Sequence, residues 1–286
     1  MLPERLARDP RILAVRDGIA AEHLRGAVEA SRFVHGVRRQ VRAGSAALRK
    51  APEANAEQVN QALFGEGFTL YDEQEGWAWG QLDVDHYVGW MRADELGEAT
   101  PPTHRVSALR SFIFERPNLK AAPLRAVSMN ALLALGEVEA GFTKVLGVGW
   151  VFGRHVSLLG DFERDFVEVA KRFVGAPYLW GGRESAGIDC SGLVQVSLQA
   201  TGKAPLRDSD MQEQTLGEPV QPAKDFSNLQ RGDLVFWRGH VGIMESATML
   251  LHASARDMKV EIEPLAEAIA RIRGIAGEVR SVKRLG

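Results

Sequence analysis

The spacing of apolar residues changes along the chain, and each change predicts a different kind of element. Near the start, apolar side chains recur at helical spacing, which predicts a helix over residues 11–35. The residues that set this spacing are Ile12, Val15, Ile19, Leu24, Ala27 and Val28. After this stretch, turn residues separate short aromatic and β-branched runs, which are typical of strands. These runs are 68–71, 77–79 and 87–90. We therefore predict an N-terminal helical segment over 1–36 and a small β-barrel over 37–99.

A stiff Thr-Pro-Pro-Thr segment at residues 100–103 separates this barrel from a second β-rich unit. The predicted strands of the second unit are 112–114, 127–129, 142–145 and 150–152. Both units approach a Gly-Trp or Gly-x-Trp strand near their ends, which is a modest indication of a repeated fold. The pattern predicts a second small barrel over 104–159.

Helical spacing returns after the second barrel. Asp161 is predicted to cap a helix that runs through Phe162, Phe166 and Phe173, and Gly175 is predicted to end it. A loop and a helix over 189–200 follow, and then a polar stretch and several strands. A helical first half followed by antiparallel strands is an α+β arrangement, which we expect for residues 161–286.

Composition changes this picture little. The 286 residues are 45% hydrophobic and 25% charged, as in an ordinary globular protein of two or three domains. The formal charge of −2 does not point to a nucleic-acid partner. Residues 1–50 carry eleven Lys or Arg against five acids. A solvated basic helix is the simpler interpretation of that excess, and a loose contact with an anionic polymer is the alternative.

The single cysteine, Cys190, excludes an internal disulfide. Residues 1–5 lead into no apolar run of signal-peptide length, and no stretch reaches the roughly 18 apolar residues of a membrane span. From the sequence we expect a soluble, cytoplasmic protein that contacts no membrane.

Cys190 stands at a predicted helix start, where a cysteine is suited to nucleophilic chemistry. Asp189 is a good N-cap, and Gly202 closes the helix at its far end. The unpaired N–H groups of a first helical turn favour a thiolate, which is the reactive form of cysteine. The same groups can stabilise an oxyanion after attack on a carbonyl. A small buried apolar role is the ordinary alternative for a lone cysteine.

Two histidines fall on one predicted hairpin downstream of this helix. Residues 240–244 and 250–253 read as its strands, joined by a short turn at 245–247. If Met244 pairs with Thr248, His240 lies directly opposite His252 and shares its face. One imidazole then orients the other, which is the relation that a cysteine nucleophile requires of its base. A shift of one residue would destroy that geometry.

Zinc binding is the alternative use of one cysteine and two histidines. The chain has no Cys-x-x-Cys pair and no carboxylate obviously aligned with them, so we expect no metal and no cofactor.

At these residues the chain resembles the NlpC-type cell-wall cysteine peptidases. The motifs that carry the resemblance are Pro177-Tyr178-Leu179-Trp180-Gly181-Gly182, Asp189-Cys190-Ser191-Gly192-Leu193, Arg207-Asp208-Ser209, Gly232-Asp233-Leu234 and Gly239-His240-Val241-Gly242. The likeness covers 161–286, and the upstream units resemble bacterial SH3-like domains. It implies a papain-like α+β domain preceded by two small SH3-like β-barrels. The layout is similar to the γ-D-glutamyl-L-diamino-acid endopeptidases of murein peptide recycling, which cleave after γ-D-Glu in peptides with a free N-terminal L-Ala.

The resemblance also implies roles for single residues. Cys190 matches the nucleophile, His240 the base and His252 the orienting residue. Tyr178 matches a tyrosine that assists the oxyanion. Trp180, Ser191, Asp208 and Ser209 match substrate-binding positions, and an acid such as Asp208 can pair with the free amine of the substrate.

In such enzymes the first SH3-like domain narrows the cleft, and Glu66 and Tyr87 are the candidates for that contact. The alternatives are a solvated turn residue for Glu66 and a core position for Tyr87. His86 stands where a turn glycine is commoner in such sequences, which leaves the local backbone open.

The expected partner is therefore a murein peptide. A thiol amidase or acyltransferase on the same fold remains open, as does a wall-peptide binding protein with an inactive catalytic domain. The catalytic residues alone do not exclude the transferase, whereas their full presence argues against the inactive protein.

Overall fold

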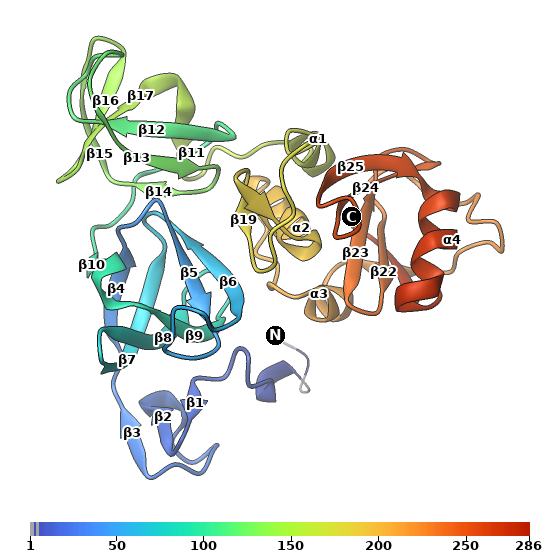
Figure 1. The fold of residues 1–286 in the computed structure, drawn as a ribbon, viewed down its shortest axis with the longest axis horizontal. Helices are drawn as coiled ribbons and strands as arrows, with labels where there is room; N and C mark the ends of the chain where they lie inside the picture. The colour runs from blue at the N-terminus through green and yellow to red at the C-terminus, as the bar shows by residue number, and fades with distance from the viewer. Residues whose placement is uncertain (1–2, 4–5) are drawn as a thin grey trace. The chain divides into compact units, whose positions relative to one another are not determined.

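The chain forms two compact units in a computed structural model that describes residue 3 and residues 6–286 (Figure 1). The units are Met1–Asp161 and Phe162–Gly286. Among the described residues, the α-helices all fall in the second unit, whereas the first is built from strands and short 3-10 turns.

The predicted helix over 11–35 is wrong, because this stretch forms a small sheet. Its strands are β1 (Val15–Arg16), β2 (Ile19–Ala21) and β3 (Arg32–Val34), with 3-10 turns at η1 (Leu6–Arg8) and η2 (Glu22–Leu24). Asp17 and Gly18 have φ values of 41° and 77°, and Gly26 has 83°. A helix cannot pass through left-handed backbone. The apolar spacing instead serves burial, since Ala14 and Ala21 pack against the tryptophans Trp77, Trp79 and Trp90.

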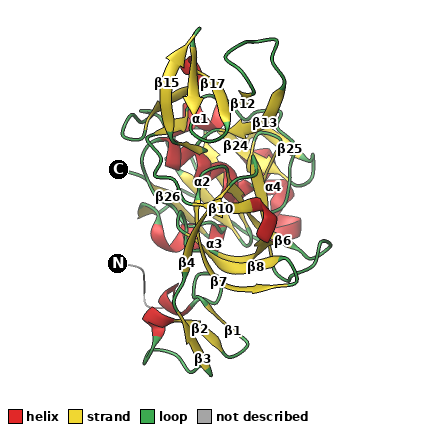
Figure 2. Cartoon of the chain, turned by 90° about the vertical axis from the view of Figure 1, so that its left-hand side faces the viewer, coloured by secondary structure: helices red, strands yellow, loops and turns green. Residues whose placement is uncertain are grey.

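The first barrel follows as one antiparallel sheet. Its strands are β4 (Val37–Val41), β5 (Ser45–Arg49), β6 (Gln58–Leu63), β7 (Gly67–Gln74), β8 (Trp77–Leu82), β9 (Val88–Arg92) and β10 (Leu96–Glu98), with the 3-10 turn η3 (Ala93–Glu95). They pair in the order β10-β4-β7-β8-β9-β5-β6, and β7 and β8 lie side by side in Figure 2. Side chains alternate between faces along a strand, so Ala46 and Leu48 of β5 enter the core with Phe68 and Met91.

The second barrel consists of two sheets. Its strands are β11 (His104–Val106), β12 (Arg110–Phe114), β13 (Pro123–Ser128), β14 (Leu132–Leu133), β15 (Leu135–Glu139), β16 (Phe142–Val145), β17 (Gly149–Phe152) and β18 (Val156–Leu158), with the 3-10 turn η4 (Gly153–His155). The sheet orders are β14-β11-β18 and β13-β12-β17-β16-β15. Leu63 and Phe64, which end the first barrel's β6, belong to the core of this second barrel. The barrels are therefore joined by shared apolar packing as well as by the Pro-rich segment.

The second unit is a mixed α+β domain. Its helices are α1 (Phe166–Lys171), α2 (Cys190–Ala200), α3 (Ser209–Thr215) and α4 (Leu265–Ala276). Its strands are β19 (Arg183–Glu184), β20 (Gly187–Ile188), β21 (Glu218–Val220), β22 (Leu234–Trp237), β23 (His240–Met244), β24 (Met249–Ser254), β25 (Lys259–Pro264) and β26 (Ser281–Arg284). The main sheet is antiparallel, in the order β21-β26-β22-β23-β24-β25.

Helix α1 begins later than the sequence predicts. Asp165, and not Asp161, is its N-cap, since the Asp165 carboxylate accepts hydrogen bonds from the N–H groups of Val167 and Glu168. Gly175, with φ of 86°, follows the helix at its C-terminal side. Aspartate is a favoured N-cap residue, so both Asp161 and Asp165 fit the sequence preference. Only the hydrogen bonds to the first turn of α1 show that Asp165 is the cap.

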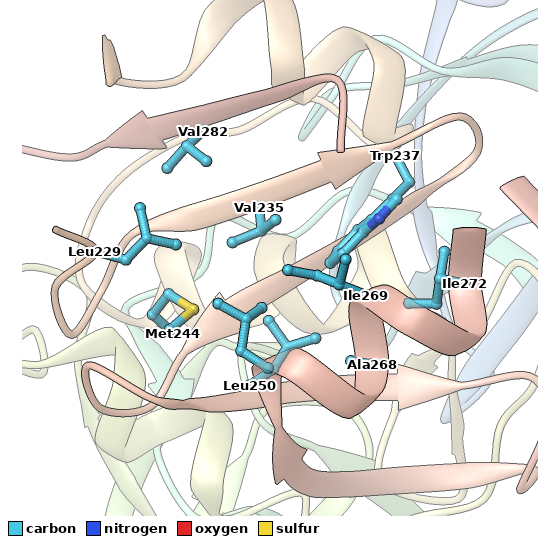
Figure 3. Packing of buried hydrophobic residues seen from close by; sticks show 10 residues of the cluster. Leu229, Val235, Trp237, Met244, Leu250, Ala268, Ile269, Ile272 and Val282 are labelled. Atoms are coloured by element: carbon cyan, nitrogen blue, oxygen red, sulfur yellow. The ribbon is translucent and has the colours of Figure 1, made fainter. Parts of the chain in front are cut away.

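Helix α4 covers one face of the main sheet. Ala268, Ile269 and Ile272 of α4 pack on Trp237 and Leu250 in a continuous buried cluster (Figure 3). The same face of the sheet also carries the two histidines. His240 lies opposite Trp237 in register, and residue 252 follows Leu250 by two positions. Burial against α4 thus fixes the face on which the site is built.

Candidate active site

Cys190 is the first residue of α2, and the local hydrogen bonds explain why the helix begins there. Asp189 is the N-cap, as predicted, and its Oδ1 accepts a hydrogen bond of 2.7 Å from the Gly192 N–H. Its Oδ2 accepts one of 2.8 Å from the Gly181 N–H. One carboxylate therefore holds both the helix start and the preceding loop, so the backbone around the thiol is fixed.

Arg207 secures this carboxylate, a role that the sequence reading missed. Its guanidinium forms a two-pronged ion pair with Asp189, at 2.9 and 2.5 Å, and the arginine is 1% exposed. The same guanidinium donates to Ser191 Oγ at 2.8 Å and to the Gly182 carbonyl at 3.3 Å. Paired charges and satisfied donors are what allow such groups to be buried. The sequence feature that could have revealed this role is the position of Arg207 in the Arg207-Asp208-Ser209 motif.

The two histidines meet, but not in the predicted register. Strands β23 and β24 pair Ile243 with Leu251 and Met244 with Leu250, because the connecting turn is longer than expected. Extending that register puts His252 opposite Gly242, so the predicted pairing of Met244 with Thr248 is wrong by two residues. An even shift keeps both side chains on one face. His240 Nε2 and His252 Nδ1 are 2.9 Å apart, and the ring centroids are 5.0 Å apart.

Cys190 lies next to the start of β23. The backbone N–H groups of Val241 and Ser191 form hydrogen bonds to its side chain, and Val241 directly follows His240. His240 uses Nε2 toward His252. The ring nitrogen of His240 that this contact leaves for another partner is therefore Nδ1.

The pKa of Cys190 is raised to about 12, contrary to the expectation of a stabilised thiolate. Burial is the main cause, and the negative charge of Asp189 adds to it. The N–H groups of Val241 and Ser191 and the charge of Arg207 act in the opposite direction. The hydrogen bonds from backbone N–H groups thus lower the pKa of Cys190, as expected, but burial raises it by more.

The pKa of His240 is lowered to about 3, mainly by burial and further by the charges of His252 and Arg271. Burial also lowers the pKa of His252, while Glu263 opposes that effect. Both directions favour the uncharged forms, a thiol beside a neutral imidazole. His240 is thus available to accept the thiol proton during attack.

Tyr178 stands beside the thiol with its proton retained. Burial raises the pKa of its phenol, and a thiolate at Cys190, where it forms, and the carboxylate of Asp189 raise it further. Its backbone N–H donates to the Met258 carbonyl at 2.9 Å, which ties the loop to the β24–β25 connection. A protonated phenol is a hydrogen-bond donor, as an oxyanion requires.

The other predicted binding residues of this unit have different settings. Ser191 is buried, and its hydroxyl donates to Asp189 at 3.3 Å while accepting from Arg207, so it contributes to the helix start. Trp180 is 56% exposed. Asp208 is the N-cap residue of α3 without a side-chain capping bond, and Ser209 is the first residue of that helix. The contacts with substrate that the sequence predicts for Trp180, Asp208 and Ser209 remain predictions.

Glu66 and Tyr87 both lie inside the first barrel. Glu66 is 3% exposed and its Oε2 accepts a 2.8 Å hydrogen bond from the Leu63 N–H, so it is not a solvated turn residue. Tyr87 packs in the barrel core. His86, between Asp85 and Tyr87, has φ of 63°, a left-handed conformation that glycine adopts more readily than other residues. The contact of Glu66 and Tyr87 with substrate remains a prediction.

The hydrogen-bond chain continues beyond His252 to residues that the sequence reading did not single out. His252 Nε2 lies 2.8 Å from Glu263 Oε1, and Arg271 of α4 donates to the same oxygen. Glu261 stands directly opposite His252 on β25. The alternation of Glu261 and Glu263 was visible in the sequence, but their approach to His252 depends on strand register.

Within the described part of the chain, no helix is both long and apolar enough to cross a bilayer.

Comparison with known proteins identifies both parts of the chain. The bacterial dipeptidyl-peptidase SH3 domain matches residues 48–96, and the NlpC/P60 family matches residues 175–275. The gamma-D-glutamyl-L-lysine dipeptidyl-peptidase of Bacillus subtilis is 30% identical over 236 residues, which cover 73% of this chain and 76% of that protein. Dipeptidyl-peptidase 6 of Lysinibacillus sphaericus is 28% identical over 202 residues, which cover 69% and 70%.

A solved structure shows the same fold over most of the chain. It is the crystal structure of an NlpC/P60 family protein from Bacillus cereus, with a TM-score of 0.72 at 22% identity. The match covers 87% of this chain and 99% of that one. The resemblance and the fold class inferred from the sequence are confirmed, namely a papain-like α+β domain preceded by two SH3-like barrels. With a cysteine nucleophile candidate beside a histidine pair, the chain belongs to the NlpC/P60 family and is a cysteine peptidase.

Proposed function

We propose that this peptidase hydrolyses the bond between γ-D-Glu and the diamino acid of murein peptides that have a free N-terminal L-Ala. The observation that carries the proposal is the 2.9 Å contact of His240 Nε2 with His252 Nδ1, next to the thiol at the start of α2. The names of the two relatives support it, since one is a γ-D-glutamyl-L-lysine dipeptidyl-peptidase and the other a dipeptidyl-peptidase.

The reaction follows from the neutral resting pair. As Cys190 Sγ attacks the amide carbonyl, its proton passes to His240 Nδ1, and a carbon–sulfur bond forms. The tetrahedral oxyanion is met by the phenol of Tyr178 and by backbone N–H groups at the start of α2. His240 then gives the proton to the leaving amine of the diamino acid, and the amide bond breaks. Water, deprotonated by the same imidazole, splits the thioester and restores the thiol.

Selection of the free amine is assigned to the α3 start. A carboxylate at Asp208 can pair with the substrate ammonium, and acylated or longer chains lack that charge. Ser209 and Trp180 add a hydrogen bond and an aromatic surface. The first barrel, through Glu66 and Tyr87, is proposed to limit the length of the bound peptide. A substrate with a free L-Ala is a released wall fragment, so we propose a role in recycling such fragments in the cytoplasm.

Mass spectrometry of three incubations tests the proposal. The purified protein is given L-Ala-γ-D-Glu-meso-diaminopimelate, its lysine analogue, or the N-acetylated form of the first peptide. We expect release of L-Ala-γ-D-Glu from both free-amine peptides and little from the acetylated one. Cys190→Ala should lose cleavage by about 10⁵-fold or more, as loss of a nucleophile does in comparable enzymes.

Each other outcome has a definite meaning. Equal cleavage of the acetylated peptide would keep the peptidase and remove the amine-binding role of Asp208. Full activity in Cys190→Ala would overturn the mechanism. If no peptide is cleaved, an acyl donor and acceptor assay tests the amidase or transferase alternative on the same thiol.

A further inference from the structure

The histidine pair is the middle of a longer hydrogen-bonded chain. It runs from His240 to His252 at 2.9 Å, from His252 to Glu263 at 2.8 Å, and ends at Arg271, which donates to the same Glu263 oxygen. His252 is 1% exposed, and the side chains of Glu263 and Arg271 are 17% exposed. Water therefore has little access to compete for these contacts.

Each group in this chain limits what its neighbour can do. An arginine guanidinium only donates hydrogen bonds, and an ionised carboxylate only accepts them. Glu263 Oε1 thus requires a proton on His252 Nε2. A neutral imidazole carries one N–H, so His252 Nδ1 must accept, and the donor to it is the Nε2–H of His240. Nδ1 of His240 is left without a proton, as the base for the thiol must be.

We propose that Glu263, held by Arg271, is a positioning residue that sets the tautomers of both histidines and keeps His240 Nδ1 free to accept the Cys190 proton. The kinetic part of this proposal rests on the peptidase function proposed above, whereas the tautomers do not. Tautomer matters here because the resting imidazole is neutral. An imidazolium has both nitrogens protonated and offers no choice.

Other charged groups surround the pair, and none supplies the same contact. Glu261 on β25 lies directly opposite His252. Its Oε2 lies 3.5 Å from Lys259 Nζ, and its buried Oε1 has no hydrogen-bond partner among the described residues. From β23 the facing group is His240, and from α4 it is Arg271. Among the carboxylates of the described residues, Glu263 is the one that hydrogen-bonds to the His252 ring.

Glu263→Met is the sharp test, because methionine has a similar length but offers no oxygen acceptor. Arg271 and His252 bond the same carboxylate oxygen, and its loss leaves His252 Nε2 without the acceptor that favours a proton there. The wild-type order of donors is then no longer imposed, and we expect a larger share of His240 to be protonated at Nδ1, the nitrogen that faces the thiol. We expect kcat to fall on the order of 10²-fold, within the range that a lost general base costs. KM should change little, because Glu263 does not touch substrate.

Histidine tautomers are read directly from ¹⁵N chemical shifts of the full-length protein labelled at histidine. The wild type should show His240 protonated at Nε2, and Glu263→Met should show a larger share protonated at Nδ1. Glu267→Met is the matched control, since it removes an exposed carboxylate from α4 and should change neither kcat nor the shifts. Glu263→Gln keeps an oxygen acceptor and should retain more activity than Glu263→Met.

The outcomes separate this proposal from the function on which its kinetics rest. Wild-type kcat and unchanged tautomers in Glu263→Met would overturn it, as would a His240 already protonated at Nδ1 in the wild type. If the wild type cleaves no peptide but the tautomers behave as expected, the positioning role stands and the proposed function fails. If thermal unfolding of Glu263→Met matches the wild type while kcat falls, a purely structural role is excluded.

Discussion

At the scale of single residues, Cys190 is governed by burial more than by the helix on which it sits. Its pKa is raised to about 12 and that of His240 is lowered to about 3, so both shifts favour the uncharged pair. Transfer of the proton then has to occur during the reaction. The reaction rate then depends on how well His240 is oriented to take the proton. In an enzyme with a preformed ion pair, it would depend instead on how well the thiolate is stabilised.

Alkylation of Cys190 by iodoacetamide should therefore depend steeply on pH. Only the thiolate reacts, and a raised pKa keeps the thiolate scarce below the pKa. The rate should climb about tenfold per pH unit from pH 7 to 10 without levelling off. Mass spectrometry follows the reaction cleanly because the chain has one cysteine. A fast rate that is constant between pH 5 and 8 would instead indicate a thiolate–imidazolium pair.

Arg207 is the residue whose loss should damage the site without touching the reacting atoms. Arg207→Met leaves the buried Asp189 carboxylate unpaired and removes the donors to Ser191 and Gly182. Breaking one side of a buried ion pair costs about 3–5 kcal/mol. Chemical denaturation should show that loss, whereas Arg273→Met, at an exposed ion pair with Glu278, should cost less than about 1 kcal/mol. Equal effects of the two changes would contradict the assigned role of Arg207.

At the scale of elements, the sequence predicted what is local and missed what depends on register. Asp189 and Gly202 mark the ends of α2 because capping is decided within one turn. The pairing of β23 with β24 was misplaced by two residues because turn length is not visible in the apolar pattern. Glu263 could not be found for the same reason, since its contact with His252 follows from the register of β24 with β25.

The N-terminal segment failed for a related reason. Apolar spacing over 11–35 fits a helix, but Asp17, Gly18 and Gly26 have positive φ values that turn the chain instead. The burial of this segment comes from tryptophans contributed by β8 and β9 of the first barrel. Tertiary packing thus overrode the periodicity, as it does for short segments with weak helix propensity.

A glycine in α2 offers a test of how tightly that helix is placed. A Cβ at Gly192 would lie 2.3 Å from the Gly182 carbonyl oxygen, which also accepts from Arg207. Gly192→Ala should cost about 1–3 kcal/mol through overpacking and should lower peptidase activity by shifting the helix start. Gly274→Ala in α4 is the control, since nothing lies within 4 Å of its Cβ. That change should stabilise the protein by about 0.5–1 kcal/mol, because alanine favours the helix more than glycine does. A loss of stability would show that this gain is smaller than the cost of a disturbed contact elsewhere.

At the scale of the whole molecule, each unit carries its own core. The catalytic unit buries Trp237, Leu250 and Ile272 between sheet and α4, and the barrels bury Phe68 and Ile113 in clusters of their own. The barrels are also fixed to one another. Gly65 has φ of 81°, and a Cβ there would lie 1.9 Å from the Leu132 carbonyl oxygen. The sequence identified both barrels and the catalytic domain, but not this shared packing, because it joins positions remote in the chain.

The catalytic unit holds Cys190, both histidines and Glu263 and has a complete core of its own. The fragment 162–286 should therefore fold alone and keep the hydrogen bonds that link His240, His252 and Glu263. Thermal unfolding and the pH dependence of Cys190 alkylation, compared with the full chain, test this directly. If the barrels limit the bound peptide, the fragment should also cleave longer peptides that the full chain rejects, with kcat changed by less than about tenfold because the reacting groups are intact. A folded fragment with unchanged selectivity would remove Glu66 and Tyr87 from substrate recognition and leave that role to the α3 start. A fragment that fails to fold would show that the barrels support the catalytic core itself, and the two units would then have to be treated as one folding entity.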